Sequence, residues 1–289
     1  MRADNLRGAG LMVLAMLGFA IEDAFIKALA GALPVGQIIG MLGLGGAAVL
    51  AVIMAVQGIP YWHSGLARPA VFLRNLGELI GTLGFVTAIA LIPLSTASAI
   101  LQVTPLLVTL AAALFLGEQV GWRRWTAILV GFAGVLLIIR PGLEGFDWLS
   151  LFAVQGAGGL ALRDLMTRRI PPEASSMQLS LLAFLTLIPA AALLLWVAAT
   201  PMVMPEGAQW ALMGGAVCIG VLCYYFIVLA MRVGEISFVT PFRYSRIVFA
   251  LVIGMAIFGE RPDALTLLGC AVVVGSGLYM LGRERVVKG

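Results

Sequence analysis

The chain has 289 residues, of which 62% are hydrophobic and 11% are charged, with a mean hydropathy of +1.07. Soluble domains carry about 25% charged residues, so this composition excludes a water-soluble globular protein and predicts a polytopic membrane protein. The net charge of +4 comes from basic residues scattered between apolar segments, a pattern that does not indicate nucleic-acid binding.

Ten apolar runs have the length of membrane-spanning helices, which need about 20 mostly apolar residues. The predicted spans of the first half are 8–29, 34–57, 68–91, 94–115 and 122–139. Those of the second half are 148–168, 177–199, 209–230, 236–257 and 264–282. We interpret the first run as a retained helix and not as a signal peptide, because Glu22 and Asp23 interrupt it.

An offset of 141–143 residues relates two halves of the chain, 1–142 and 143–289. The matched pairs are Asp23 with Asp164, Lys27 with Arg168, Ser95 with Ser237, Ser98 with Thr240, Glu118 with Glu260, and Gly134 with Gly277. Because each half has an odd number of spans, two similar halves must face opposite ways in the bilayer. The sequence therefore predicts an all-α polytopic membrane protein, with ten transmembrane helices as two inverted five-helix repeats around a central cavity.

The distribution of arginine and lysine predicts the orientation of these spans. With a cytoplasmic N-terminus, the cytoplasmic segments contain Arg2, Arg7, Arg68, Arg123, Arg124, Arg168, Arg169, Arg232, Arg283, Arg285 and Lys288. The opposite side then contains only Lys27, Arg140 and Arg261. Basic residues are enriched in cytoplasmic loops, so we expect both termini in the cytoplasm and a location in the bacterial inner membrane.

Several charged side chains fall within the predicted spans, where each costs about 2.5–3.5 kcal/mol at a helix centre. They are Glu22, Asp23, Arg74, Glu78, Arg163, Asp164, Arg243 and Arg246. Such groups must face one another or a wet cavity. They predict a polar central chamber.

Two arginines of the ninth span are the strongest candidates for substrate binding. Arg243 and Arg246 are three residues apart and share one side of a helix. Paired guanidinium groups suit a carboxylate, which they bind bidentately. The alternative is that each arginine neutralises a buried acid. The matching positions of the first half are Leu101 and Thr104, so this feature breaks the repeat symmetry.

Further polar and aromatic residues complete the predicted substrate site. Glu78 or Asp23 is expected to bind an amino group, and the rest of the substrate is expected to contact Tyr224, Tyr244 and Gln102. The aromatic residues are equally explained as ordinary helix packing or interface anchors.

Two carboxylates are candidates for carrying a coupled proton, Glu78 and Glu22. A carboxylate in a low-dielectric chamber is easily protonated, whereas a local pair between Glu78 and Arg74 would oppose this role. Structural ion pairs are expected for the other charges. Lys27 follows Asp23 by four residues, and Arg168 follows Asp164 likewise, with Arg163 beside it. We expect these pairs to act as structural clamps, with a role as two gates as the alternative.

No signature of an enzyme or of a metal or cofactor site is present in the sequence. The only histidine is His63, the cysteines lie in apolar runs, and neither a P-loop nor a Gly-x-Ser-x-Gly motif occurs. We therefore expect no catalysis, no metal and no cofactor.

The chain resembles the drug/metabolite transporter superfamily, specifically its EamA-type exporters. The residues that carry the resemblance are Pro105, Leu116-Gly117-Glu118 and Gly131-Phe132-Ala133-Gly134 in the first half, and Phe258-Gly259-Glu260 and Gly275-Ser276-Gly277 in the second. It is also similar to bacterial aromatic amino acid and paraquat exporters. This resemblance implies that helices 1, 3, 4, 6, 8 and 9 line the cavity, and that amino acids are substrates.

Together these observations predict a secondary transporter that exports amino acids or related small metabolites by alternating access. A carrier for nucleotide-derived metabolites or organic cations is the alternative, and an integral membrane enzyme or a channel is disfavoured. The expected partners are a small-molecule substrate and the lipid bilayer, and a monomer is compatible with the sequence.

Overall fold

The computed structural model describes residues 2–115, 121–141, 147–167, 169–170, 174–233 and 239–288. For residues 2, 3, 124, 228, 231, 232, 240 and 280–288 it gives the backbone alone. The regular secondary structure of these described ranges is entirely helical. This confirms the predicted all-α class.

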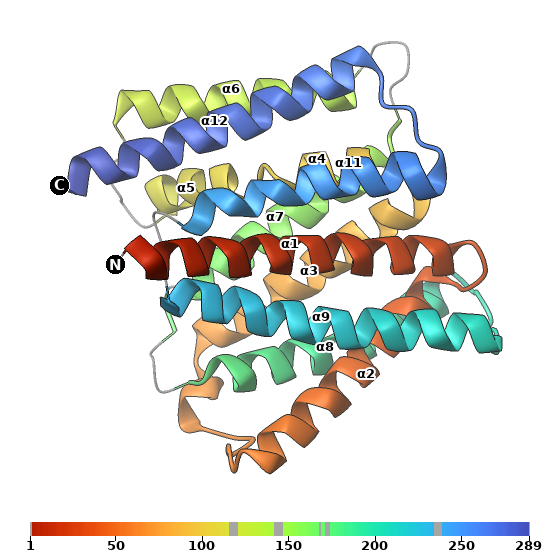
Figure 1. Cartoon of the computed structure of the whole chain (residues 1–289). Helices are drawn as coiled ribbons and strands as arrows, with labels where there is room; N and C mark the ends of the chain where they lie inside the picture. Colours follow the sequence, from red (N-terminus) through yellow and green to blue (C-terminus); the bar gives the residue numbers. More distant parts are fainter. Residues whose placement is uncertain are drawn as a thin grey trace.

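The helices lie at the predicted spans (Figure 1). The first half contains α1 (Arg2–Ala30), α2 (Val35–Val56), α3 (Pro69–Leu91), α4 (Leu94–Leu101), α5 (Thr104–Phe115) and α6 (Trp122–Ile139). The second contains α7 (Ser150–Thr167), α8 (Ser176–Val197), α9 (Gly207–Val233), α11 (Ser245–Phe258) and α12 (Ala264–Lys288). Two short 3₁₀ helices are η1 (Ser64–Ala67) and η2 (Thr240–Tyr244).

Seven helical segments within the described ranges are long and apolar enough to cross a membrane. They are α1, α2, α3, α4 with α5, α8, α9, and η2 with α11. The apolar parts of α6 and α12 are shorter, and α7 is not among the candidates. The chain is thus a multi-pass membrane protein, and the count of ten spans stays a prediction.

The fourth predicted span, 94–115, is not one continuous helix, which corrects the sequence-based expectation. Pro105 has no N–H to donate to the carbonyl of Leu101, four residues earlier. The Thr104 hydroxyl donates to that carbonyl instead, at 2.6 Å. The chain consequently breaks between α4 and α5. The ninth span is similarly irregular, because η2 with Pro241 precedes α11.

Four helix pairs account for most of the packing. α3 packs along α7, α1 along α9, α2 along α8 and α6 along α12. Figure 1 shows α6 and α12 at one edge of the bundle and α2 and α8 at the other, with α1 between them. The buried charged residues Asp23 of α1 and Arg74 of α3 therefore lie in the interior of the bundle.

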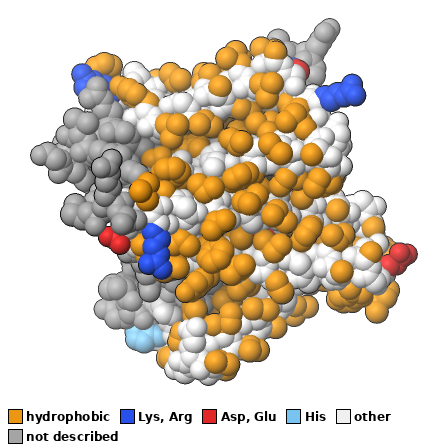
Figure 2. Space-filling model, in the orientation of Figure 1, with side chains coloured by type: hydrophobic (Ala, Val, Ile, Leu, Met, Phe, Trp, Pro, Cys, Tyr) orange, Lys and Arg blue, Asp and Glu red, His pale blue; other side chains and the backbone are white. Residues whose placement is uncertain are grey.

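The surface is apolar, as a bilayer requires. Figure 2 shows hydrophobic side chains over most of the visible face, with the few charged side chains near the two edges where helices end. Large exposed hydrophobic residues include Phe72, Phe115 and Trp196, which are 70%, 75% and 78% exposed. In a soluble protein such a surface would aggregate, whereas in lipid it is the expected solvent contact.

Candidate functional site

Asp23 and Arg246 form the central ion pair of the bundle. The Arg246 Nη2 and Nε atoms donate to one Asp23 carboxylate oxygen at 2.7 and 3.2 Å. The guanidinium also lies 5.2 Å from the ring centroids of Phe19 and Phe85. Asp23 is 3% exposed. The structure therefore ties α1 to α11 with a desolvated charge pair, and Arg246 is already fully engaged.

Lys27 does not pair with Asp23, contrary to the sequence-based expectation. Its ammonium donates to the carbonyls of Ile89 and Ile92, at 3.2 and 2.7 Å, where α3 ends. The last carbonyls of a helix lack helical partners and form the negative end of its dipole. Lys27 also lies 3.8 Å from Glu260. The end of α3 thus competes successfully with Asp23 for this cation.

Glu260, which follows α11, binds the first residues of α4. Its carboxylate accepts from the Ser95 N–H at 3.0 Å, from the Ser95 hydroxyl at 2.6 Å and from the Leu94 N–H. A carboxylate is favoured at a helix N-terminus because it satisfies free N–H groups and the dipole. Lys27, Glu260 and Ser95 define what we refer to as the Glu260 end of the bundle.

Glu78 on α3 lies between two arginines. Its carboxylate is 3.5 Å from Arg74 Nη2 and 3.4 Å from Arg163 Nη1. Arg163 also pairs with the neighbouring Asp164, at 2.8 Å. Arg163 thus takes the place that the sequence analysis gave to Arg168 as the partner of Asp164, and Arg168 itself lies outside the described residues. These contacts join α3 to α7.

Arg243 in η2 has no ion pair or side-chain hydrogen bond among the described residues. The groups that act electrostatically on its guanidinium are, largest first, Asp164, Arg163, Arg246 and Tyr244. Its backbone carbonyl accepts a hydrogen bond from Gln102 Nε2 at 3.0 Å. This contact links the α4–α5 break to η2. Gln102 therefore holds the backbone of Arg243 and leaves the guanidinium free.

The two predicted aromatic residues have different surroundings. Tyr244 is 4% exposed, and its hydroxyl packs against Gly277 of α12 without a hydrogen-bond partner among the described residues. Its hydroxyl therefore lies against α12, although Tyr244 is also close enough to Arg243 to interact electrostatically with it. Tyr224 on α9 is partly buried and lies close enough to Arg163 to interact electrostatically. Both tyrosines therefore border the cluster, Tyr224 through Arg163 and Tyr244 through Arg243.

The cluster on α3, α7 and η2 contains one more cation than its acids can neutralise. Its described charged residues are the arginines Arg74, Arg163 and Arg243 and the carboxylates Glu78 and Asp164. Glu78 and Asp164 are held by the other two arginines, so the surplus charge is that of Arg243. An unpaired guanidinium in a desolvated site is suited to an anionic ligand.

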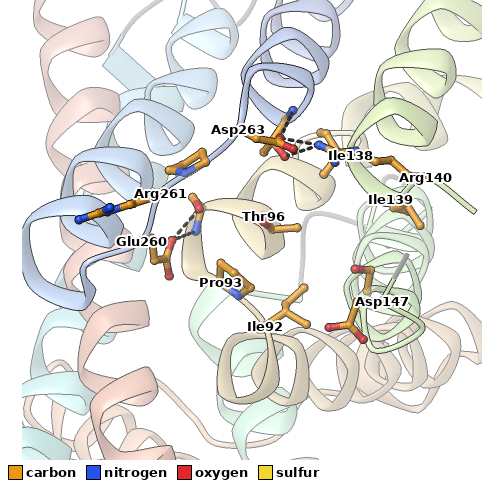
Figure 3. Close-up of a pocket in the computed structure, with 14 residues that line it drawn as sticks. Ile92, Pro93, Thr96, Ile138, Ile139, Arg140, Asp147, Glu260, Arg261 and Asp263 are labelled. Carbon is orange, nitrogen blue, oxygen red and sulfur yellow. Dashed lines mark hydrogen bonds and ion pairs between the residues drawn. The ribbon is translucent and has the colours of Figure 1, made fainter. Parts of the chain in front are cut away.

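A separate cavity of about 300 Å³ opens at the Glu260 end (Figure 3). Its polar lining includes Ser95, Thr96, Arg140, Asp147, Glu260 and Asp263. Figure 3 shows Arg140 directed toward Asp263, and Glu260 directed toward the start of α4. The cavity lies away from Arg243, since neither Arg243 nor the α7 acids line it.

Arg140 and Asp263 connect α6 to α12 beside this cavity. The Arg140 guanidinium donates to the Asp263 carboxylate and to the Thr266 hydroxyl. The Asp263 carboxylate also accepts from the Thr266 N–H at 2.9 Å. The hydrogen bond from Arg140, followed by those from Thr266, lowers the pKa of Asp263 well below its ordinary value. This pair was not predicted, because Arg140 and Asp263 are far apart in the sequence.

The structure thus separates the predicted site residues into two groups. Arg243, Glu78, Tyr224, Arg163 and Asp164 form one cluster with a surplus positive charge. Asp23 and Arg246 form the other, with Glu22 adjacent on α1. The contact between Glu260 and Ser95 was not predicted, although both residues belong to pairs matched by the offset of 142 residues.

Comparison with known proteins identifies the family. The model of the "EamA-like transporter family" matches this chain at residues 6–140 and 148–282. The chain is 27% identical over 76% of its length to the "S-adenosylmethionine uptake transporter" of Rickettsia felis, covering 74% of that protein. It is 28% identical over 92% of its length to the "Pseudopaline exporter CntI" of Pseudomonas aeruginosa UCBPP-PA14, covering 93% of it. A solved structure described as "Crystal structure of protein" matches the fold with a TM-score of 0.61, at 20% identity, over 98% of this chain and 99% of that one.

Proposed function

This chain belongs to the EamA-like transporter family, and we propose that it is a secondary transporter of a small amino-acid-like metabolite that carries a carboxylate. The surplus positive charge of Arg243 carries this proposal. The guanidinium of Arg243 binds the carboxylate of the substrate. The amino group of the substrate replaces an arginine as the partner of Asp164 or Glu78. Tyr224 contacts the rest of the substrate.

The chain architecture in this proposal consists of two inverted halves, 1–142 and 143–289. The packing pairs support it. Under the repeat correspondence, α1 matches α7 and α3 matches α9, so the pair α1–α9 exchanges with the pair α3–α7. The pairs α2–α8 and α6–α12 each map onto themselves. Such an arrangement allows alternating access, in which the halves rock about a shared central site.

The Glu260 end faces the outside of the inner membrane in this proposal, with both termini in the cytoplasm. The distribution of basic residues supports this orientation. The family does not fix the direction of transport, since one relative is named for uptake and another for export. We keep export as the proposed direction on the resemblance to amino acid exporters.

A carrier for nucleotide-derived metabolites is the second candidate. The relative named for S-adenosylmethionine uptake favours it, because that compound is both an amino acid and a nucleoside derivative. A nucleoside group would stack on Tyr224, while its amino acid part would still bind Arg243.

Counterflow in proteoliposomes tests the proposed function. Labelled tryptophan, S-adenosylmethionine and the dication paraquat form the panel. We expect saturable exchange of a carboxylate-bearing solute and not of paraquat. Exchange of paraquat alone would overturn the proposal, and exchange of S-adenosylmethionine without tryptophan would select the second candidate.

Arg243→Ala tests the role of the surplus charge. Hydrogen bonds to charged groups contribute about 1.5–3 kcal/mol, so we expect the half-saturating concentration to rise by about 10- to 100-fold. Arg123→Ala is the control, since Arg123 is exposed and stacks on Trp122. Unchanged affinity in the folded Arg243→Ala protein would contradict the assignment.

A further inference from the structure

Glu22 on α1 occupies a notch in the neighbouring helix α9. A Cβ atom added to Gly220 would lie 2.6 Å from one Glu22 carboxylate oxygen and 3.2 Å from the other. The carboxyl group therefore occupies the space that a side chain at position 220 would fill, and it would have to shift if residue 220 were not glycine. This position lies in the seam of the α1–α9 pair, one of the two interior pairs.

Glu22 differs from the other carboxylates at membrane depth that the structure describes. Asp23, Glu78 and Asp164 each bind an arginine, and Glu260 binds Lys27 and the start of α4. Glu22 has neither an ion pair nor a hydrogen bond among the described residues. Glu22 is partly buried. An unpaired carboxylate at membrane depth is costly, whereas the neutral acid is far less so.

The surroundings of Glu22 disfavour a second negative charge. The charged and titratable groups that act on it are Asp23 on α1, Arg246 on α11 and Cys223 on α9. Arg246 is already bound to Asp23. The helices α2 and α4 bring no charged side chain, and the charges of α3 are paired within the α3–α7 cluster. The segment η2 also packs against α1 and brings Arg243 and Tyr244. The charges that act on Glu22 are nevertheless those of Asp23 and Arg246.

We propose that Glu22 is the site of a transported proton, and that this proton is coupled to movement of α1 against α9. This inference rests on the proposed transport function. In this proposal, the carboxyl group that sits in the Gly220 notch is protonated. Loss of the proton to water on one side of the membrane leaves a carboxylate, which competes with Asp23 for Arg246.

The arrangement connects the proton to the substrate site through α11. Arg246 binds Asp23 and also acts electrostatically on Glu22, and Arg243 lies one helical turn before it. A shift of Arg246 toward Glu22 therefore moves the segment that carries the proposed carboxylate ligand. Glu78 is the less suitable proton carrier of the two candidates, because Arg74 and Arg163 stabilise its charged form.

Infrared difference spectra between high and low pH test the proton site without any substrate. We expect a protonated-carboxyl C=O band in the wild type that is absent from Glu22→Gln. Glu206→Gln is the matched control, because Glu206 is an exposed residue outside the helices. A band that persists in Glu22→Gln overturns the inference. Gly220→Ala, which fills the notch, is expected to shift the pH at which the band titrates, and an unchanged titration also counts against the inference.

Uptake by proteoliposomes tests the coupling. For the panel solute with the fastest counterflow, we compare uptake with and without a pH gradient. We expect the pH gradient to increase uptake severalfold in the wild type and in Glu206→Gln. In Glu22→Gln we expect the same uptake with and without the gradient. A wild type with counterflow but no response to the gradient overturns the coupling and leaves the proposed function standing. If the infrared band depends on Glu22 but no solute of the panel shows counterflow, the proton site is supported and the proposed function is contradicted.

Discussion

At the scale of single residues, each buried charge pairs with the nearby polar or charged groups that lack another hydrogen-bonding partner. Lys27 binds the free carbonyls at the end of α3 and not the nearby Asp23. Asp23 binds Arg246 of α11, whose guanidinium also stacks on two aromatic rings. Sequence spacing favours local pairs, but a desolvated charge gains more from several contacts at once.

The pair of Arg140 and Asp263 contributes to the pH dependence of the free energy of unfolding. The folded state lowers the pKa of Asp263, so its contribution is complete above the ordinary aspartate value of about 4. That contribution is lost as the pH falls from there through the folded pKa. We therefore expect Asp263→Asn to lower the unfolding temperature in detergent at pH 7, and the difference from the wild type to shrink below pH 4.

Thermal unfolding at a series of pH values measures this prediction. Asp147→Asn is the control at the same cavity, since among the described residues the Asp147 carboxylate accepts a hydrogen bond only from the Leu149 N–H. A difference between wild type and Asp263→Asn that stays constant down to the lowest pH would count against it.

At the scale of elements, glycines set how closely the interior helices approach. Along α3 and α7 the backbones are in contact, and a Cβ on Gly84 would lie 2.6 Å from the backbone nitrogen of Gly156. Between α1 and α9, in contrast, side chains fill the glycine positions, as Phe25 does at Gly215 and Glu22 at Gly220. The α3–α7 pair is therefore the more rigid seam, and α1–α9 is the pair that can adjust.

Two adjacent glycines of α7 test the rigid seam. A Cβ on Gly159 would collide with the backbone of Gly81, whereas a Cβ on Gly158 meets nothing within 4 Å. We expect Gly159→Ala to destabilise the protein by about 1–3 kcal/mol through overpacking. Gly158→Ala is expected to be neutral or stabilising by up to about 1 kcal/mol. Reversible unfolding in mixed micelles measures the free energy of unfolding of both variants. Equal changes in the two variants would contradict the close backbone contact between α3 and α7.

At the scale of the whole molecule, two ion-pair layers hold α1 to α11. Asp23–Arg246 is the deeper layer, and Lys27–Glu260 lies at the Glu260 end, where it also ties in α3 and α4. Both layers connect the first half of the chain to the second. Alternating access would require the Glu260 end to release these contacts when it opens.

Weakening this end is expected to expose the interior. A cysteine replaces Ser98, which is buried one helical turn after Ser95. We expect this cysteine to react with an impermeant maleimide, added to intact cells, severalfold faster in Lys27→Met than in the protein that retains Lys27. The native cysteines Cys218, Cys223 and Cys270 are first replaced by alanine. Arg261→Met, an exposed neighbour of Glu260, is the control. Equal labelling rates in both variants would show that Lys27 does not close this end.

The sequence by itself determined the all-α membrane class, the positions of the helices and the residues that had to be buried with their charges. Length and hydropathy control these features, and they are local. The break at Gln102–Val103 was also readable in principle, since Pro105 removes a helical hydrogen bond. The family resemblance rested on the glycine and glutamate motifs of both halves.

Only the tertiary structure decided which charges meet. It set Arg246 on Asp23, Lys27 on the end of α3, and Glu260 on the start of α4, through contacts between residues more than 60 positions apart. The two arginines of the ninth span consequently have different environments, with Arg246 neutralised and Arg243 unpaired among the described residues. A helical period places two side chains on one side of a helix, but the neighbouring helices determine what each of them faces.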